Sequence, residues 1–153
     1  MERGDLAPVV LFVYNRPDHT SKTLTSINLL PEAGQTDLYI YADQAKNESA
    51  QATVDAVRAL VEDFVDNKSR FRSAKLICAS QNQGLAKSII SGVSRIIDEY
   101  GSVIVLEDDL EVAPDFLSYM NGALEYYRNE ESIWAISGYT FPMQALQGYP
   151  HDV

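Results

Sequence analysis

The stretch VIVLEDD, residues 103–109, joins the most β-prone run of the chain to three consecutive carboxylates. A continuous run of β-branched and aliphatic residues is typical of a strand buried on both faces of a parallel sheet. Charged side chains do not continue such a run, so the strand should end where the acids begin. We therefore expect a strand over residues 102–106 that delivers Glu107, Asp108 and Asp109 to one edge of a sheet.

Short apolar runs alternate with amphipathic stretches along the rest of the chain. The helical stretches place apolar residues at helical spacing, as with Leu24 and Ile27 or with Val54, Val57 and Val61. This alternation predicts an α/β fold, a mostly parallel, Rossmann-like sheet with helices on both faces, in a single domain over residues 1–153. The expected strands are residues 9–14, 38–42, 76–79, 102–106 and 133–136.

Several side chains are expected in the core on the same grounds. Cys78 lies in an apolar run and should be a small buried hydrophobe, and Trp134 should pack on the fifth strand. The helix expected over residues 85–100 should turn one set of side chains inward, namely Leu85, Ile89, Val93, Ile96 and Tyr100.

Composition excludes several classes of protein. The formal net charge of -10 argues against general affinity for nucleic acid, which needs clustered Lys and Arg. No apolar run approaches the roughly 20 residues of a membrane span, and the first residues lack a signal-peptide core. The single cysteine allows no intrachain disulfide. We expect a cytoplasmic, soluble domain without a membrane span.

Polar residues follow every expected strand. Ligands of open α/β sheets bind beyond the carboxyl ends of the strands, so these positions are the candidate site. They are Asn15-Arg16, Asp43, Ser80 to Gly84, Glu107 to Asp109, and Ser137-Gly138.

The three carboxylates at residues 107–109 favour a divalent cation. Confining like charges at the end of a buried strand is costly, and hard oxygen ligands suit Mn²⁺ or Mg²⁺. Side-chain alternation sends Glu107 and Asp108 to opposite sides, so one metal cannot use all three acids equally. A solvated acidic turn before the next helix explains the same residues without a metal.

Three neighbours have a functional and a plain interpretation. Arg16 could meet a phosphate, or could form a surface ion pair. Asp43 could accept a hydrogen bond from a base N–H, or could cap a turn. Gln83-Gly84 could present helix amides to an anion, or could form an ordinary junction.

Three segments resemble a known family of enzymes. Residues 8–17, PVVLFVYNRP, resemble the first strand of GT-A glycosyltransferases. Residues 103–116, VIVLEDDLEVAPDF, look very like the metal-site segment of the eukaryotic N-acetylglucosaminyltransferases related to N-acetylglucosaminyltransferase I and to the protein O-mannose enzyme. Residues 133–137 are similar to the strand that follows in those enzymes.

The resemblance implies a role for each candidate residue. Asp109 would bind the Mn²⁺ (or Mg²⁺) that bridges the nucleotide diphosphate. Asp108 would contact the ribose or sugar side of the donor, and Glu107 would lie close to the donor sugar. Arg16 would contact the nucleotide, and Asp43 would contact the uracil.

The reaction implied by the resemblance is an inverting transfer from a UDP-sugar to a hydroxyl of a glycan or another acceptor. The family's catalytic base lies in an acceptor-binding half beyond the acidic run, and the sequence ends at Val153, where neither His151 nor Asp152 matches it. We therefore expect residues 1–153 to be the N-terminal, donor-binding part of a longer glycosyltransferase, with the base unassigned.

Other functions fit the sequence less well. Nucleotidyltransferases usually place a glycine-rich, basic loop after the first strand, where this chain has Asn15 to Asp18. A receiver-type signalling module needs an Asp after the third strand, where this chain has Ser80-Gln81. A module that binds a sugar nucleotide without turnover stays open.

Overall fold

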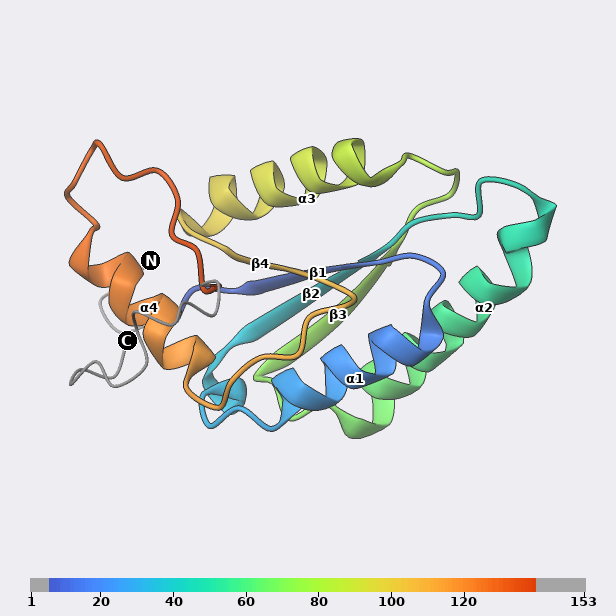
Figure 1. The fold of residues 1–153 in the computed structure, drawn as a ribbon, viewed down its shortest axis with the longest axis horizontal. Helices are drawn as coiled ribbons and strands as arrows, with labels where there is room; N and C mark the ends of the chain where they lie inside the picture. Colours follow the sequence, from blue (N-terminus) through green and yellow to red (C-terminus); the bar gives the residue numbers. More distant parts are fainter. Residues whose placement is uncertain (1–5, 140–153) are drawn as a thin grey trace, which may run out of the picture.

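The computed structural model describes residues 6–139 (Figure 1). Eight main elements alternate between strand and helix, with a 3-10 turn at Ala33–Gln35 and a π-helical turn at Phe64–Lys68. In chain order they are β1 Val9–Val13, α1 Pro17–Asn28, β2 Asp37–Ala42, α2 Glu48–Asp63, β3 Ser73–Cys78, α3 Leu85–Tyr100, β4 Ile104–Glu107 and α4 Phe116–Tyr126.

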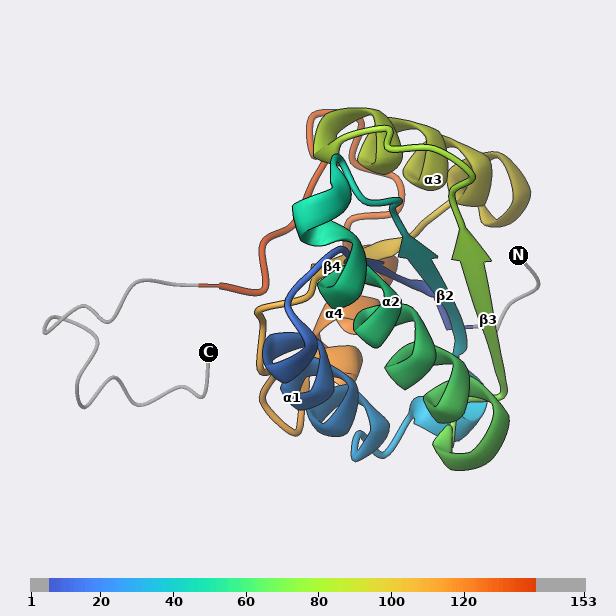
Figure 2. The ribbon, with the colours of Figure 1, turned by 90° about the vertical axis from the view of Figure 1, so that its right-hand side faces the viewer.

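The four strands form one parallel sheet in the order β3-β2-β1-β4. Helices α1 and α2 cover one face and α3 covers the other, while α4 lies beside α1 (Figures 1 and 2). The predicted α/β class, with a parallel sheet and helices on both faces, is confirmed. All four strands point the same way, so their carboxyl ends lie at one edge of the sheet.

The strand β1 is buried along its whole length because it is central in the sheet. Alternate side chains of β1 enter two cores. Leu11 packs with Leu24 and Val57 under α1 and α2, whereas Phe12 packs with Ile96 under α3. The first core is much the larger of the two and also takes in Leu117 and Met120 of α4.

The prediction of a fifth strand at residues 133–136 is wrong within the described part of the chain. These residues form no strand, and the sheet ends at β4. Local turns hold the segment instead: the Ile133 amide donates to the Glu130 carbonyl, and the Trp134 indole N–H donates to the Glu131 carbonyl. Trp134 is 93% exposed and does not pack in the core. A β-prone sequence forms a strand only where another strand is available to pair with it.

Two further core predictions are wrong for reasons of position. Cys78 is exposed because it ends β3, an edge strand of the sheet. Leu85 is 57% exposed because it begins α3, where the helix starts beyond the strands. The rest of the predicted inner face of α3 behaves as expected, with Ile96 fully buried and Ile89, Val93 and Tyr100 partly buried in the α3 core.

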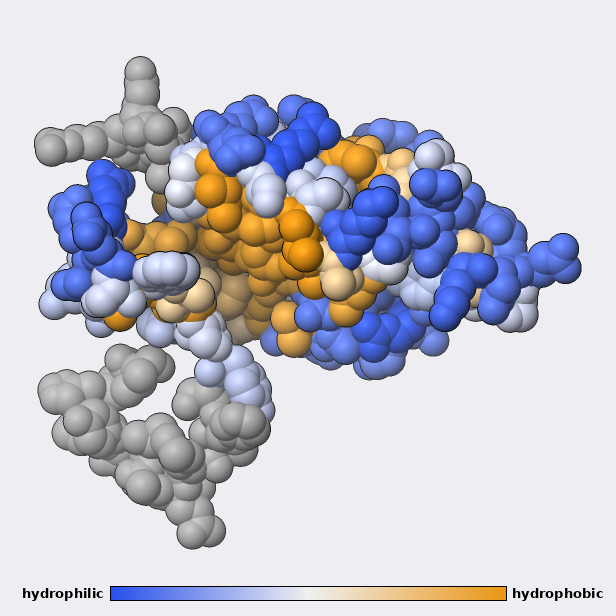
Figure 3. Space-filling model, turned by 90° about the horizontal axis from the view of Figure 1, so that it is seen from above, coloured by the Kyte–Doolittle hydropathy of each residue, from blue (hydrophilic) through white to orange (hydrophobic). Residues whose placement is uncertain are grey.

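Apolar side chains are exposed beside the free edge of β4. Ile90 and Ile97 of α3 and Val105 of β4 all keep 40% or more of their surface accessible. Figure 3 shows this apolar area on the α3 side of the molecule. Among residues 6–139, no helix combines the length and apolar character that a membrane crossing requires.

A charged network joins β2, β3 and α3 at the amino ends of the strands. The buried Asp37 carboxylate accepts hydrogen bonds from Nε and Nη2 of Arg72, at 2.9 and 2.7 Å, and from the Ser73 hydroxyl at 2.8 Å. The Tyr100 hydroxyl lies 3.4 Å from the same carboxylate. The hydrogen bond from Arg72 holds the pKa of Asp37 below its usual range, against the opposing effect of burial.

We predict that Asp37→Asn lowers the free energy of unfolding by about 2 kcal/mol near neutral pH, since hydrogen bonds to a charged group are lost. A depressed native pKa stabilises the fold above the unfolded-state pKa of about 3.9 and ceases to do so as pH falls through the native value. The difference between wild type and variant should therefore shrink as the solution is acidified below about pH 4. Urea unfolding across pH measures it.

Asp98→Asn, on the exposed surface of α3, is the matched control and should change the unfolding midpoint little at any pH. An Asp37→Asn variant as stable as this control near neutral pH would contradict the role given to the network.

Candidate functional site

A pocket of about 550 Å³ opens at the carboxyl ends of β1, β2 and β4 and at the start of α3. Four of the five predicted site residues line it, and they come from the carboxyl ends of three strands, β1, β2 and β4: Arg16, Asp43, Glu107 and Asp108. Ser137 and Gly138, predicted beside them, are not among the lining residues because the strand expected before them is absent. Parallel pairing of adjacent strands brings the four together.

Asp108 is a buried carboxylate, with only 3% of its surface exposed. Its Oδ1 accepts a hydrogen bond from Nη2 of Arg16, and its Oδ2 accepts one from the Tyr14 amide at 3.4 Å. The neighbouring strands β1 and β4 create this contact, because Phe12 and Glu107 pair in register. The guanidinium neutralises a charge that burial would otherwise penalise.

Arg16 also reaches the next carboxylate. Its Nη1 donates to Oδ2 of Asp109 at 3.0 Å, so one guanidinium bridges two consecutive acids. The Arg16 and Asp109 side chains are 45% and 41% exposed. Burial opposes the charge on Arg16, but attraction to Asp108 and hydrogen bonds to both acids outweigh it and raise the Arg16 pKa. Asp109 thus stands at the rim, beside the pocket rather than among its lining residues.

Glu107 ends β4 and lines the pocket with an exposed side chain. Its carboxylate has no hydrogen bond or ion pair within residues 6–139. Strand alternation places it on the α3 side of the sheet, together with Phe12. The prediction that Glu107 and Asp108 diverge is consistent with the exposure of one and the burial of the other.

Asp43 ties the end of β2 to the start of α3. Its Oδ1 accepts hydrogen bonds from the amides of Gln44 at 2.8 Å and Gln83 at 2.9 Å. Its Oδ2 accepts them from the Gly84 amide at 2.8 Å and the Asn82 side-chain amide at 3.1 Å. The carboxylate is therefore the anchor of the loop before α3.

The loop depends on Gly84 for a second reason. Gly84 has a φ of +77°, a conformation that side chains with a Cβ rarely adopt. Its amide meets Asp43 while its carbonyl accepts the Ser88 amide of the first turn of α3. The Gln83-Gly84 segment is therefore a loop-to-helix junction whose backbone amides bind the carboxylate of Asp43.

Two aromatic side chains, Phe12 and Tyr41, are among the residues that line the pocket. The rings of Phe12 and Tyr41 stack with centroids 5.5 Å apart and planes at 26°. Helix α3 approaches this pair closely at Gly92, where an added Cβ would lie 3.0 Å from Phe12 and 3.3 Å from Tyr41.

Two cations near the pocket were missed from the sequence. Arg58 of α2 donates through Nη2 to the carbonyls of Ala79 at 2.7 Å and Asp43 at 3.2 Å, which joins the ends of β2 and β3. Lys46 lines the pocket with an exposed side chain. The position of Arg58 beside the buried face of α2, marked by Val57, was the one available signal, and it is weak because helices often carry an arginine there.

The acidic residues could supply one or two ligands to a divalent cation, which would need the rest from a bound phosphate group and water. Residues 6–139 contain no group of three or more His, Cys, Asp or Glu side chains placed to hold an ion. Asp109 is nevertheless exposed, and its Oδ1 has no hydrogen-bond partner among those residues. Mg²⁺ and Mn²⁺ commonly take one or two carboxylates and complete their coordination with phosphate and water.

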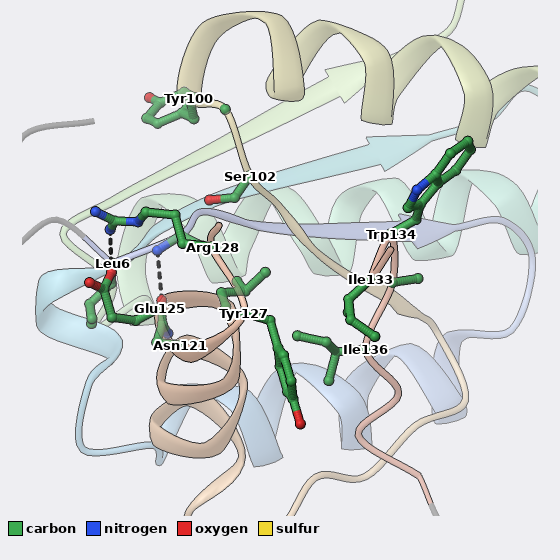
Figure 4. A pocket seen from close by; sticks show the side chains of 14 residues that line it. Leu6, Tyr100, Ser102, Asn121, Glu125, Tyr127, Arg128, Ile133, Trp134 and Ile136 are labelled. Carbon is green, nitrogen blue, oxygen red and sulfur yellow. Dashed lines mark hydrogen bonds and ion pairs between the residues drawn. The ribbon is translucent and has the colours of Figure 1, made fainter. Parts of the chain in front are cut away.

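A second cavity, of about 850 Å³, lies at the opposite ends of β1 and β4 (Figure 4). Helix α4, the end of α3 and residues 133–136 line it. Its charged groups are paired with each other, as in the ion pair of Arg128 with Glu125, and Asn121 holds the Ala7 amide at 2.8 Å. Although this cavity is larger, we place the candidate site in the pocket at the carboxyl ends, where unlike charges converge on open space.

Comparison with known families adds an independent finding. The model of the GNT-I family matches residues 90–142, a segment that contains most of α3, all of β4 and α4, and the three acids at 107–109. The match confirms the predicted resemblance to enzymes like N-acetylglucosaminyltransferase I. Members of this family are glycosyltransferases, and the chain is similar to them over the segment that builds one side of the pocket.

We predict that Asp43→Ala lowers the free energy of unfolding by about 2 kcal/mol, because it leaves several buried or partly buried donors without an acceptor. The amides of Gln83 and Gly84 should exchange with solvent much faster, as measured by hydrogen exchange followed by NMR. Asp43→Asn keeps one acceptor oxygen, so its stability and its amide exchange rates should lie between those of wild type and Asp43→Ala. Unchanged exchange at both amides in the alanine variant would contradict the anchoring role of Asp43.

Proposed function

We propose that this chain binds a UDP-sugar together with Mn²⁺ or Mg²⁺ in the pocket at the carboxyl ends of the sheet, for transfer of the sugar to an acceptor hydroxyl with inversion. The observation that carries the proposal is the convergence of Arg16, Asp43, Glu107 and Asp108 on one pocket. The match of residues 90–142 to a glycosyltransferase family supports the same reading.

The two ends of the pocket suit the two ends of a nucleoside diphosphate. The uracil would lie at the Asp43 end, near the Phe12 and Tyr41 side chains that line the pocket. The diphosphate would lie at the other end, near the Arg16 guanidinium, whose planar set of donors matches phosphate oxygens. Asp108 would then face the ribose or sugar side of the donor.

Within this arrangement Asp109 would supply the protein's ligand to the cation. Its exposed carboxylate stands at the pocket rim, where metal charge would stabilise the departing diphosphate. Glu107 is open to solvent at the lining of the pocket and would lie near the donor sugar. The acceptor oxygen would attack the anomeric carbon on the face opposite the diphosphate, forming the new C–O bond as the bond to UDP breaks. A base still to be assigned would take the hydroxyl proton.

We predict that UDP binds the protein more tightly with Mn²⁺ than without it, and that Asp109→Asn removes at least about tenfold of that metal-dependent affinity. Loss of the anionic ligand is the physical reason. Isothermal titration calorimetry with UDP, at fixed ionic strength and with or without Mn²⁺, measures both quantities.

Glu111→Gln is the matched control, because it removes one charge from an exposed acid two positions along the chain. It should leave the Mn²⁺-dependent gain unchanged. Equal losses in the two variants would mean that only the general acidity of the segment matters, and would contradict the assignment of Asp109. Release of UDP from a UDP-sugar, with and without a glycan acceptor, separates a transferase from a module that only binds the donor.

A further inference from the structure

One guanidinium serves as the counter-ion of two consecutive carboxylates. Arg16 donates from Nη2 to Asp108 and from Nη1 to Asp109. The residues are more than 90 positions apart, and the pairing of β1 with β4 brings them together. The free protein therefore already carries a cation on the acid proposed to hold the metal.

We propose that Arg16 and the divalent cation are alternative counter-ions of Asp109, and that the nucleotide diphosphate accepts the guanidinium which the metal displaces. Metal and nucleotide would then bind cooperatively, each weakly alone and tightly together. The inference rests on the proposed function, because it concerns the same donor and metal.

The two contacts of Arg16 differ in how easily they can change. Asp108 is buried and also accepts the Tyr14 amide, so its carboxylate is fixed on both oxygens. Asp109 is 41% exposed and has Arg16 as its single hydrogen-bond partner within the described chain. The contact with Asp109 can therefore be exchanged for another ligand while the contact with Asp108 persists.

The Arg16 side chain is free to make that exchange, although its backbone is held. The Arg16 carbonyl accepts both the amide and the hydroxyl of Thr20 in the first turn of α1, each at 2.9 Å. The side chain itself is 45% exposed and lines the pocket. A guanidinium has five N–H donors, so it can keep one bond to Asp108 and turn others toward a phosphate.

Electrostatics links the exchange to the nucleotide. A divalent ion on Asp109 would stand close to the positive Nη1 of Arg16, and two cations in contact repel each other strongly. A metal that binds without the nucleotide must therefore displace the Arg16 guanidinium from Asp109, and the guanidinium loses that carboxylate as a partner. A diphosphate places negative charge between the two cations and reverses the sign of the interaction, so the second ligand favours the first.

The test is to count free Mn²⁺ by electron paramagnetic resonance during titration of wild type, Arg16→Gln and Arg128→Gln, each without and with saturating UDP. Arg128→Gln is the matched control, since it removes the same charge from an exposed ion pair at the second cavity. Arg16→Lys is included because it keeps a counter-charge for buried Asp108 and protects against loss of folding, which urea unfolding checks.

Without UDP, Arg16→Gln should bind Mn²⁺ about fivefold more tightly than Arg128→Gln, because the competing cation is gone. In wild type, UDP should raise Mn²⁺ affinity at least about tenfold, and Mn²⁺ should raise UDP affinity by the same factor. The factor by which UDP raises Mn²⁺ affinity should be several-fold smaller in Arg16→Gln than in wild type. In Arg16→Lys it should lie between the values for wild type and Arg16→Gln.

The inference is overturned if Arg16→Gln binds Mn²⁺ no more tightly than Arg128→Gln while wild type still shows cooperative binding with UDP. That result would leave the proposed function standing. Absence of any binding of UDP and Mn²⁺ to wild type would instead overturn both the proposed function and this inference.

Discussion

The ion pair between Arg16 and the buried Asp108 is the constraint on which the pocket depends. A carboxylate that is 3% exposed needs a counter-charge, and removing its partner would leave a buried charge unpaired. The pair exists because β1 and β4 are parallel neighbours that end at the same edge. It fixes the start of α1 against the turn after β4, and so defines one wall of the pocket.

Asp43 defines the opposite wall by a different means. Its carboxylate accepts hydrogen bonds from amides of the loop before α3, while Arg58 donates to the Asp43 carbonyl and to the Ala79 carbonyl after β3. Within residues 6–139, the other charged side chains of the site therefore have partners in the protein, whereas the exposed side chains of Glu107 and Lys46 have none. The pocket therefore has its shape before a ligand binds, and a ligand must replace existing contacts between protein groups when it binds their charged side chains.

Sequence reasoning succeeded wherever a pattern is set by burial on both sides. The apolar run of β1 and the spacing of Val54, Val57 and Val61 have few other solutions, and parallel strands oblige the polar residues after them to converge. It failed where the outcome depends on a neighbour that local sequence does not specify. Residues 133–136 have the composition of a strand but turn back locally, and Cys78 is exposed because β3 is an edge strand.

The site divides in the same way. Arg16, Asp43 and the acids at 107–109 follow strand ends and were predicted as candidates, but the bridge from Arg16 to both aspartates required knowledge of which strands are adjacent. Arg58 could not be distinguished from any other helical arginine until three carbonyls were seen around it. The spacing of residues along the chain indicates which face of a helix or which end of a strand a side chain occupies. A contact between side chains of distant segments depends on how the segments pack.

Paramagnetic broadening by Mn²⁺ in the presence of UDP, followed amide by amide in NMR spectra, tests the central claim most directly. If the nucleotide and metal bind at the carboxyl ends of β1 and β4, resonances of residues 14–16 and 107–109 should broaden most, and those of residues 125–128 at the second cavity should broaden least. Strongest broadening at residues 125–128, or equal broadening at both places, would contradict it.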